Sequence, residues 1–356
     1  MPDASGGEKI APMKISKPKK LLPGDKIGIV ALSDISDDEK IAKSVTYLEE
    51  LGYKVIQGKT LGFYSHGRSA GSGLERLDDV VDVVGQGAKA VVLAVGGWSA
   101  SDVITEMLTR RVFRAGIYKV LQRRVLERPI IWSGYSDNLY WQNFLLAAGG
   151  IASLHGLHAQ GLLEWSDKSR ELWWDWLTKT EPKVFAGDQR WRVYLGKVGQ
   201  KPRGILIPSN LDCLSRVSGM KFLDPTVAYE DEDLIVVLED NEVYKSDILR
   251  TIDSLLYSWI LNKQMGRIQA IIIGRLVQSK EDVTGYREWE SAFWDDLVSR
   301  LAPFKIPLVR WDNFGHAWND EIKGNDFVSL PLGVRAELAI EGANKCKLTV
   351  DPLVID

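Results

Sequence analysis

The sequence predicts an α/β protein of two domains, with a mostly parallel N-terminal sheet flanked by helices and a mixed α/β domain after it. In the first half, short apolar runs alternate with segments of helical periodicity. These runs are apolar on both faces, as in a parallel sheet that helices cover on both sides. In the second half, the late strand candidates follow one another after short turns, which is typical of a mixed sheet.

The N-terminal domain is expected over residues 21–164, after a polar and flexible arm over residues 1–20. Buried apolar runs and helical spacing give its elements in order. Strands are predicted at 26–31, 54–57, 88–95 and 129–132, and helices at 38–51, 74–84 and 138–148.

The C-terminal domain is expected over residues 201–356, and a tryptophan-rich insert over residues 165–200 breaks the alternation before it. The insert carries five of the 13 tryptophans. In the domain itself, strands are predicted at 204–207, 234–238, 270–273, 307–309, 336–340 and 346–350, and helices at 246–261 and 288–301.

The composition excludes several classes of protein. With 45 basic and 48 acidic residues in 356, the net charge of −3 provides no field that would attract nucleic acid or an anionic membrane. Two cysteines, Cys213 and Cys346, are too few for a disulfide framework or a cysteine-rich zinc site. Because the first residues lack an apolar signal core and no run is long enough to span a bilayer, we expect a cytoplasmic protein.

A candidate nucleophile, Ser136, lies where a predicted buried strand turns directly into a helix. A serine at such an elbow can project its hydroxyl, while free N–H groups at the helix start face a developing oxyanion. Gly134 relieves crowding in the turn, but Asn138 occupies the place of the usual second glycine. The alternative is that Ser136 only caps the helix.

A serine nucleophile needs a base, and the base needs an orienting acid. His316 is the candidate base, because it follows a predicted strand in a loop that Gly315 allows to bend. Glu239 is the candidate acid, because it ends the buried run at 234–238, and sites in open α/β sheets gather at such carboxyl ends. Asp240 and Glu242 are close competitors for the same role.

The turn at Gly96, Gly97 and Trp98 also follows a buried strand. It lacks the glycine spacing and the downstream acid of a dinucleotide site, so no nicotinamide cofactor is expected. Its N–H groups could supply a second oxyanion donor, or it could be an ordinary glycine turn. His155 and His158 form a pair without nearby acids, and no metal site is predicted.

These residues, in this order, resemble the LD-carboxypeptidase family of serine peptidases, and in particular its microcin C self-immunity branch. The resemblance spans residues 17 to about 342. It is carried by Leu21-Leu-Pro-Gly-Asp-Lys-Ile-Gly-Ile-Val30, Ala70-Gly-Ser with Glu75-Arg76, Gly96-Gly97-Trp98, Gly134-Tyr-Ser-Asp137, Leu238-Glu-Asp240, Gly315-His316 and Leu330-Pro-Leu-Gly333.

The resemblance implies a triad of Ser136 as nucleophile, His316 as general base and acid, and Glu239 as the group that orients the imidazole. It implies an oxyanion hole made by the backbone N–H groups of Gly97 and Asp137, and a site in the groove between the two domains. It also implies a homodimer and hydrolysis of an amide near a substrate C-terminus, with neither metal nor organic cofactor.

Two substrate classes compete under this resemblance, and a catalytically inactive ligand-binding relative is a third reading. The immunity branch cleaves aminoacyl or peptidyl nucleotides, and cell-wall members remove a terminal D-amino acid from muropeptides. The tryptophan-rich insert favours the nucleotide class, because aromatic faces stack on bases. The alternative for these tryptophans is packing at a domain junction or dimer interface. The predicted substrate contacts are Trp98, Trp173, Trp174, Trp191 and Lys245.

Several positions depart from the family pattern. Val95 and Ser99 stand where an arginine and a glycine are common, and Pro208-Ser-Asn-Leu211 replaces Gly-Gly-Asn-Leu. The lysine of the immunity branch, four residues after the acid, is Val243 here, with Lys245 nearby. These differences bear on the leaving group and on the substrate's carboxylate rather than on the triad.

Overall fold

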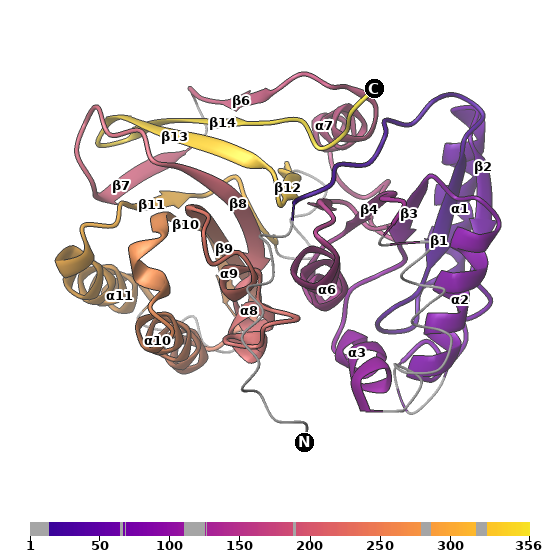
Figure 1. Cartoon of the computed structure of the whole chain (residues 1–356), viewed down its shortest axis with the longest axis horizontal. Coiled ribbons are helices and arrows are strands. Elements are labelled where there is room, and N and C mark those ends of the chain that lie inside the picture. The colour runs from indigo at the N-terminus through magenta and orange to yellow at the C-terminus, as the bar shows by residue number, and fades with distance from the viewer. Residues whose placement is uncertain are drawn as a thin grey trace.

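The computed structural model describes residues 14–64, 67, 69–109, 125, 127–187, 190–278, 286–317 and 326–356. Two sheets stand side by side, each with its own helices, and the helices α6 and α8 lie at the junction between them (Figure 1). The predicted α/β class with two domains is confirmed. Among the described helices, none is both long and apolar enough to cross a membrane.

The N-terminal sheet has six strands in the order β12-β5-β4-β3-β1-β2, all parallel except β12. Its strands are β1 (Lys26–Val30), β2 (Lys54–Gln57), β3 (Ala90–Leu93), β4 (Ile131–Gly134), β5 (Ser153–His155) and β12 (Leu330–Leu332). The helices connecting them include α1 (Asp38–Glu50), α2 (Gly73–Gly85), α3 (Ala100–Thr109) and α6 (Leu139–Gly149). Local chemistry fixes their starts: Asp37 caps α1, and Ser72 with Glu75 forms a capping box on α2.

The C-terminal sheet has eight strands in the order β6-β14-β13-β8-β9-β10-β11-β7. Its parallel centre is β8 (Arg203–Asn210), β9 (Leu234–Val243), β10 (Ile268–Gln278) and β11 (Leu308–Trp311). Antiparallel strands complete it: β6 (Lys183–Phe185), β7 (Trp191–Leu195), β13 (Arg335–Gly342) and β14 (Lys345–Val350). The helices are α8 (Leu211–Val217), α9 (Pro225–Ala228), α10 (Lys245–Leu261) and α11 (Tyr286–Leu301), with single 3-10 turns η3 (Gln264–Gly266) and η5 (Ala302–Phe304).

The tryptophan-rich segment predicted as an insert between the domains is divided between them. Its helix α7 (Asp167–Thr178) packs on the N-terminal domain, where the indole of Trp173 donates to Ser133 at 2.7 Å. Its strands β6 and β7 form the two edges of the C-terminal sheet. Near the C-terminus, one strand of the later part of the chain joins the N-terminal sheet, because β12 pairs with β5.

The prediction of a flexible arm over residues 1–20 is wrong for its last residues. Ser16 donates its backbone N–H to Gly150 at 2.6 Å and accepts from Ala152 at 3.1 Å. Lys20 donates its backbone N–H to Ile355 at 2.9 Å, and Ile355 donates its own to Pro18 at 2.9 Å, so this segment is also paired with the C-terminal end of the chain. Polar composition misled the prediction, since backbone pairing does not depend on apolar side chains. Residues 1–13 lie outside the described part of the chain.

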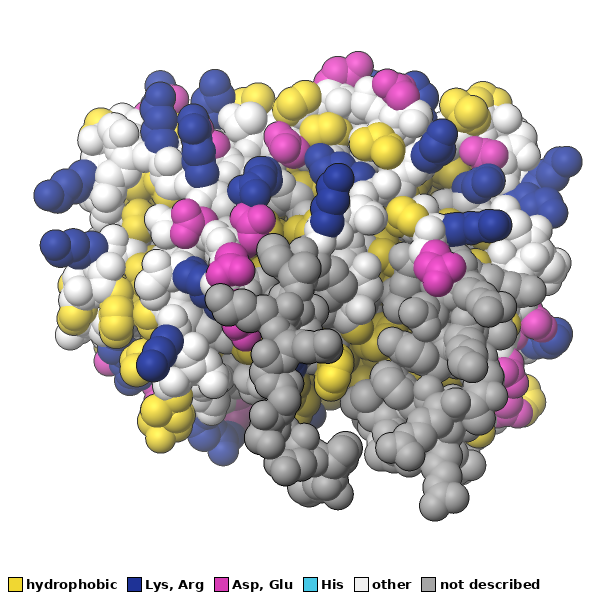
Figure 2. Space-filling view, in the orientation of Figure 1, with side chains coloured by type: hydrophobic (Ala, Val, Ile, Leu, Met, Phe, Trp, Pro, Cys, Tyr) yellow, Lys and Arg dark blue, Asp and Glu magenta, His cyan; other side chains and the backbone are white. Residues whose placement is uncertain are grey.

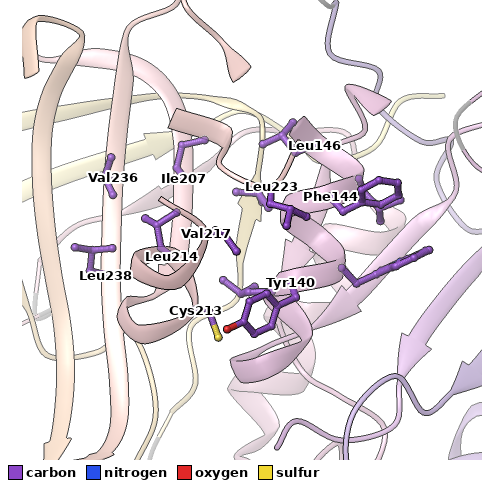
Figure 3. Packing of buried hydrophobic residues seen from close by; sticks show 14 of the residues in the cluster. Tyr140, Phe144, Leu146, Ile207, Cys213, Leu214, Val217, Leu223, Val236 and Leu238 are labelled. Carbon is purple, nitrogen blue, oxygen red and sulfur yellow. The ribbon is translucent and has the colours of Figure 1, made fainter. Parts of the chain in front are cut away.

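The two domains share a continuous apolar interface. Figure 3 shows Tyr140, Phe144 and Leu146 of α6 facing side chains of α8 and of the strands behind it. Those C-terminal side chains are buried, among them Leu214 and Val217. Because such interiors are close-packed, this interface fixes the position of one domain against the other. On the outside, basic and acidic side chains are interspersed over the face in Figure 2, in line with the near-zero net charge.

Candidate active site

Ser136 lies on a strained turn between β4 and α6. It begins the 3-10 turn η2 (Ser136–Asn138), and its φ of 63° is in the left-handed region. A residue with a β-carbon is uncommon in this conformation, which clusters at functional sites. The N-cap reading for Ser136 is not supported, because α6 begins at Leu139 with Asn138 at its cap. The local geometry is that of a nucleophile elbow.

Asn138 explains how the elbow does without its second glycine. The side chain is buried, and its Nδ2 donates to the carbonyl of Tyr135 at 3.1 Å and to that of Val95 at 3.2 Å. The second bond ties the elbow to the residue that precedes the glycine turn. The turn therefore accommodates a side chain at position 138, and the amide of that side chain links the elbow to the glycine turn.

Glu239 and His316 form a buried pair. Oε2 of Glu239 accepts the backbone N–H of His316 at 3.0 Å and also a short hydrogen bond from Nδ1 of the same residue. Gly315 makes this approach possible, because a β-carbon there would lie 2.5 Å from Cβ of Glu239. With Nδ1 donating to the carboxylate, Nε2 is left as the acceptor, which is the tautomer that a general base requires.

The charge of Glu239 is stabilised in place. Burial alone would raise its pKa, but the electrostatic interaction and the hydrogen bonds with His316, with a smaller contribution from His155, hold the pKa of Glu239 below its usual value. The carboxylate is therefore ionised at neutral pH although it has no exposed surface. Its competitor Asp240 is occupied elsewhere, because it accepts from Nδ2 of Asn210 at 2.8 Å. The side chain of Glu242 lies outside the described residues.

The pair from the C-terminal domain lies at the elbow of the N-terminal domain. Tyr135, the residue before Ser136, meets the His316 ring edge to face at 5.0 Å between centroids. Tyr135 is itself held by the ring of His158, stacked at 4.7 Å. The structure thus brings Glu239, within β9, and His316, in the loop after β11, into direct contact, and it places the ring of His316 against Tyr135, the residue before Ser136.

The turn predicted to supply the oxyanion donors lies against the elbow. A β-carbon on Gly96 would be 3.0 Å from Cβ of Ser136, so the glycine allows the two loops to touch. Asp137 supplies the other predicted oxyanion donor through its backbone. Its side-chain carboxylate accepts hydrogen bonds from the N–H of Ala100 at 2.6 Å and from the hydroxyl of Ser33. Burial raises the pKa of Asp137.

Two charged residues that the sequence analysis did not select hold this turn in shape. Asp34 accepts from the N–H of Trp98 at 3.1 Å and from the hydroxyl of Ser99 at 3.0 Å. The fully buried Arg76 donates to the carbonyls of Leu32 and Ser99 at 2.7 and 3.0 Å. The available signals for Arg76 were its place in the Glu75-Arg76 motif of the family resemblance and its position on α2, directly beside the apolar face that includes Leu77 and Val80.

A cleft of about 660 Å³ opens in front of Ser136 and is lined by both domains. Trp98 and Tyr140 line it from the N-terminal domain, and Asn210, Asp240 and Tyr244 from the C-terminal domain. Desolvation, with the charge of Glu239, raises the pKa of Asp240 to about 7. The volume falls in the range of small-molecule sites. Lys245 is not among the described residues that line this cleft.

The predicted role of the insert tryptophans in binding substrate is not supported. Trp173 is fully buried under β4, and Trp191 is stacked on Trp311 at 4.5 Å with 3% of its surface exposed. Trp174 stacks on Tyr53 at 5.2 Å, on the N-terminal domain. These tryptophans pack within the domains, Trp173 and Trp174 on the N-terminal one and Trp191 in the C-terminal one, rather than at the domain junction or dimer interface that the alternative proposed. Trp98 is the predicted aromatic residue that reaches the cleft, with 60% of its surface exposed.

A strained serine elbow in one α/β domain, with a carboxylate–histidine pair from a second domain beside it, defines a two-domain serine hydrolase. Comparison with known families agrees. Residues 27–156 match the LD-carboxypeptidase N-terminal domain and residues 203–338 match the LD-carboxypeptidase C-terminal domain. The chain belongs to the LD-carboxypeptidase family, as the sequence resemblance indicated.

Individual relatives give further comparison. A probable murein peptide carboxypeptidase of Bacillus subtilis (strain 168) is 33% identical over 141 residues, which are 39% of this chain and 40% of that protein. The match therefore spans about two fifths of the length of that relative.

Among solved structures, the MccF-like protein of Bacillus anthracis str. Ames has a TM-score of 0.74 at 19% identity, covering 94% of this chain and 99% of the other. The self-immunity protein MccF in complex with glutamyl sulfamoyl guanosine has a TM-score of 0.73 at 18% identity, covering 95% and 99%. The muramoyltetrapeptide carboxypeptidase of Oxalobacter formigenes has a TM-score of 0.69 at 20% identity, covering 93% and 100%. At these identities the likeness establishes the fold.

Proposed function

We propose that this protein hydrolyses an amide bond near the C-terminus of a small substrate, with Ser136, His316 and Glu239 as its triad. The observation that carries the proposal is the double hydrogen bond from His316 to Glu239, placed beside a serine at positive φ. An orienting acid, a base with a free Nε2 and an activated serine are the three parts that this chemistry needs.

In the proposed reaction, Nε2 of His316 takes the proton of Ser136 as Oγ attacks the substrate carbonyl. The N–H groups of Gly97 and Asp137 stabilise the oxyanion. The tetrahedral intermediate then expels the amine, which receives the proton from His316, and leaves an acyl-enzyme. Water, deprotonated by His316, attacks the ester, and the released serine recovers its proton. No metal or organic cofactor takes part in these steps.

For the substrate, we favour an aminoacyl or peptidyl nucleotide. Trp98 and Tyr244 line the cleft from opposite domains, and 60% and 42% of their surfaces are exposed. Exposed aromatic faces at a cleft of this size suit a planar base, since stacking on such faces contributes about 1–3 kcal/mol per base. Solved MccF structures described with sulfamoyl nucleosides share this fold. In this role the protein would inactivate nucleotide antibiotics.

The competing substrate is a cell-wall muropeptide, from which the enzyme would remove the terminal D-amino acid. The observation in its favour is the 33% identity to the murein peptide carboxypeptidase over 141 residues. A third possibility is a catalytically inactive relative that only binds its ligand. The Glu239–His316 pair argues against this possibility. Burying an ionised carboxylate is unfavourable, and binding a ligand alone does not require it.

A paired assay tests these alternatives. The wild-type protein and Ser136→Ala are incubated separately with an aminoacyl sulfamoyl adenosine and with a tetrapeptide muropeptide, and release is followed by mass spectrometry. We expect the wild type to cleave the nucleoside and Ser136→Ala to cleave neither. Cleavage of the muropeptide alone would overturn the preferred substrate. The implied homodimer is a separate prediction, tested by light scattering of the purified protein.

A further inference from the structure

A second histidine faces the acid of the triad. His155 is fully buried at the end of β5, and its Nε2 lies 3.8 Å from Oε1 of Glu239. Oε1 is the carboxylate oxygen that His316 does not use. Within the described part of the chain, Oε1 and both ring nitrogens of His155 have no hydrogen-bond partner.

These unpartnered atoms are chemically complementary. A buried carboxylate oxygen is an acceptor, and leaving it unpaired destabilises the folded protein. A neutral imidazole carries one N–H, and Nε2 is the ring nitrogen nearer to Glu239. At 3.8 Å the two atoms are beyond hydrogen-bond distance, and catalytic contacts of this kind are often long until substrate is bound.

The surroundings keep His155 uncharged. The rings of Phe314 and Phe327 pack against it, with centroids at 5.1 and 6.1 Å. Desolvation lowers the pKa of His155 to about 4, although the charge of Glu239 acts in the opposite direction. The other titratable or charged groups here are His316, whose charge lowers the pKa further, and Tyr135, whose ring centroid is 6.3 Å away.

His155 also has a specific place in the fold. Its register partner on β4 is Gly134, two residues before Ser136, and its partner on β12 is Leu330. Glu239 belongs to β9 of the other sheet. The contact between His155 and Glu239 therefore joins the strand next to the nucleophile to the strand that carries the acid.

We propose that His155 is a positioning residue of this site, which holds Oε1 of Glu239 with a neutral Nε2–H so that Oε2 stays on His316. The proposal rests on the proposed function, because it gives His155 a part in the same triad. It accounts for a buried, ionised acid with one oxygen unused by its catalytic partner. It also explains how two domains keep the halves of one triad aligned.

Two variants separate positioning from packing. His155→Gln retains an N–H near the position of Nε2, whereas His155→Leu keeps the volume and removes the donor. We expect His155→Leu to lower kcat by about 10- to 100-fold with KM changed by less than about threefold. His155→Gln should recover most of this loss. Without the donor the ionised form of Glu239 is less stable, so the acid limb of the kcat/KM profile should move to higher pH by roughly 0.5–1 unit.

A second measurement does not depend on turnover. The chain has four histidines, so ¹⁵N NMR of histidine-labelled Ser136→Ala protein can resolve their tautomers. We expect His155 to be neutral and protonated on Nε2 at pH 7. A proton on Nδ1 of His155 would overturn the proposal, even if His155→Leu does not fold. So would equal pH profiles for His155→Leu and wild type.

The outcome is distinguishable from a failure of the proposed function. Full activity of Ser136→Ala would reject the triad mechanism. The NMR spectrum of the same protein would still report the tautomer of His155. Conversely, loss of activity in Ser136→Ala with Nδ1 protonated on His155 would retain the triad and reject the positioning role.

Discussion

The amide of Asn138 donates to the carbonyl of Val95 at 3.2 Å and so joins the nucleophile elbow to the glycine turn beside it. Both loops follow neighbouring parallel strands, β3 and β4, which bring them to one sheet edge. The side chain is fully buried, so its hydrogen bonds are not exchanged with water. This link makes the elbow and the predicted oxyanion turn a single unit.

Replacing Asn138 should therefore affect both stability and rate. Asn138→Ala leaves the buried carbonyl of Tyr135 and the half-buried carbonyl of Val95 without this donor, and we expect a loss of about 1–3 kcal/mol in the free energy of unfolding. Misalignment of the turn should also lower kcat by roughly tenfold or more. Urea unfolding and steady-state kinetics measure the two effects. The control is Asn262→Ala, whose exposed amide contacts Ser258. Equal effects of both variants on kcat would contradict the link.

Removing the charge of Glu239 should reduce catalysis more than stability. Glu239→Gln keeps the shape of the side chain but cannot stabilise the imidazolium, so kcat should fall by about 10²- to 10⁴-fold. The matched control is Glu232→Gln, because Glu232 is a partly exposed acid paired with Arg335 at 2.8 Å. That variant should retain its kcat. If Glu239→Gln kept more than about a tenth of the wild-type rate, Glu239 would not be the orienting acid.

The exposed ring of Trp98 and the packed ring of Trp174 should respond in opposite ways to truncation. Trp98→Ala should raise KM for an aminoacyl sulfamoyl adenosine by roughly 5- to 150-fold, the equivalent of one stacked base. Trp174→Ala should lower Tm, because it removes packing against Tyr53, and leave KM unchanged. Kinetics and thermal unfolding on both variants check this. A normal KM in Trp98→Ala would argue against base stacking in the cleft.

Stability should fall on acidification because two buried histidines resist protonation. Desolvation lowers the pKa of His155 to about 4 and that of His158 to about 3, with the charge of His316 acting in the same direction. The unfolded chain takes up these protons near pH 6.5, before the folded protein does. The free energy of unfolding therefore decreases from about pH 6.5 toward pH 4, by up to ~1.4 kcal/mol per pH unit for each histidine.

Asp240 opposes this trend. Its pKa is raised to about 7, so the folded protein takes up that proton first, and lowering the pH through this range stabilises it. Asp240 therefore offsets part of the slope that the two histidines produce. Urea unfolding at pH 6.5, 5.5 and 4.5 measures how the free energy of unfolding changes with pH. His158→Phe should reduce this change, although the variant is less stable than the wild type at pH 7. An unchanged slope in that variant would reject the assignment.

Much of the fold followed from the sequence because buried parallel strands and amphipathic helices have distinct patterns. Strand 26–31 and helix 38–51 differ from the observed β1 and α1 by one residue. The strand ends in turn indicated Ser136, Glu239 and His316, since sites in α/β sheets gather there.

The remaining features depend on contacts that no local pattern records. The exposure of a tryptophan is decided by its neighbours, so the stacking of Trp191 on Trp311 could not be read from residues 165–200. The pairing of Lys19 with Ile355 joins the two ends of the chain through backbone atoms. Likewise, the hold of Arg76 on the glycine turn depends on α2 and α3 lying side by side in the folded protein.

The most direct test of the triad is covalent labelling of its nucleophile. A fluorophosphonate probe reacts with a serine activated by a base, and intact-mass analysis with peptide mapping locates the adduct. We predict one adduct, on Ser136, with labelling abolished in Ser136→Ala and unchanged in Ser246→Ala, whose serine is exposed on α10. Labelling of Ser136→Ala to the same extent as wild type, or an adduct on another serine, would contradict the account.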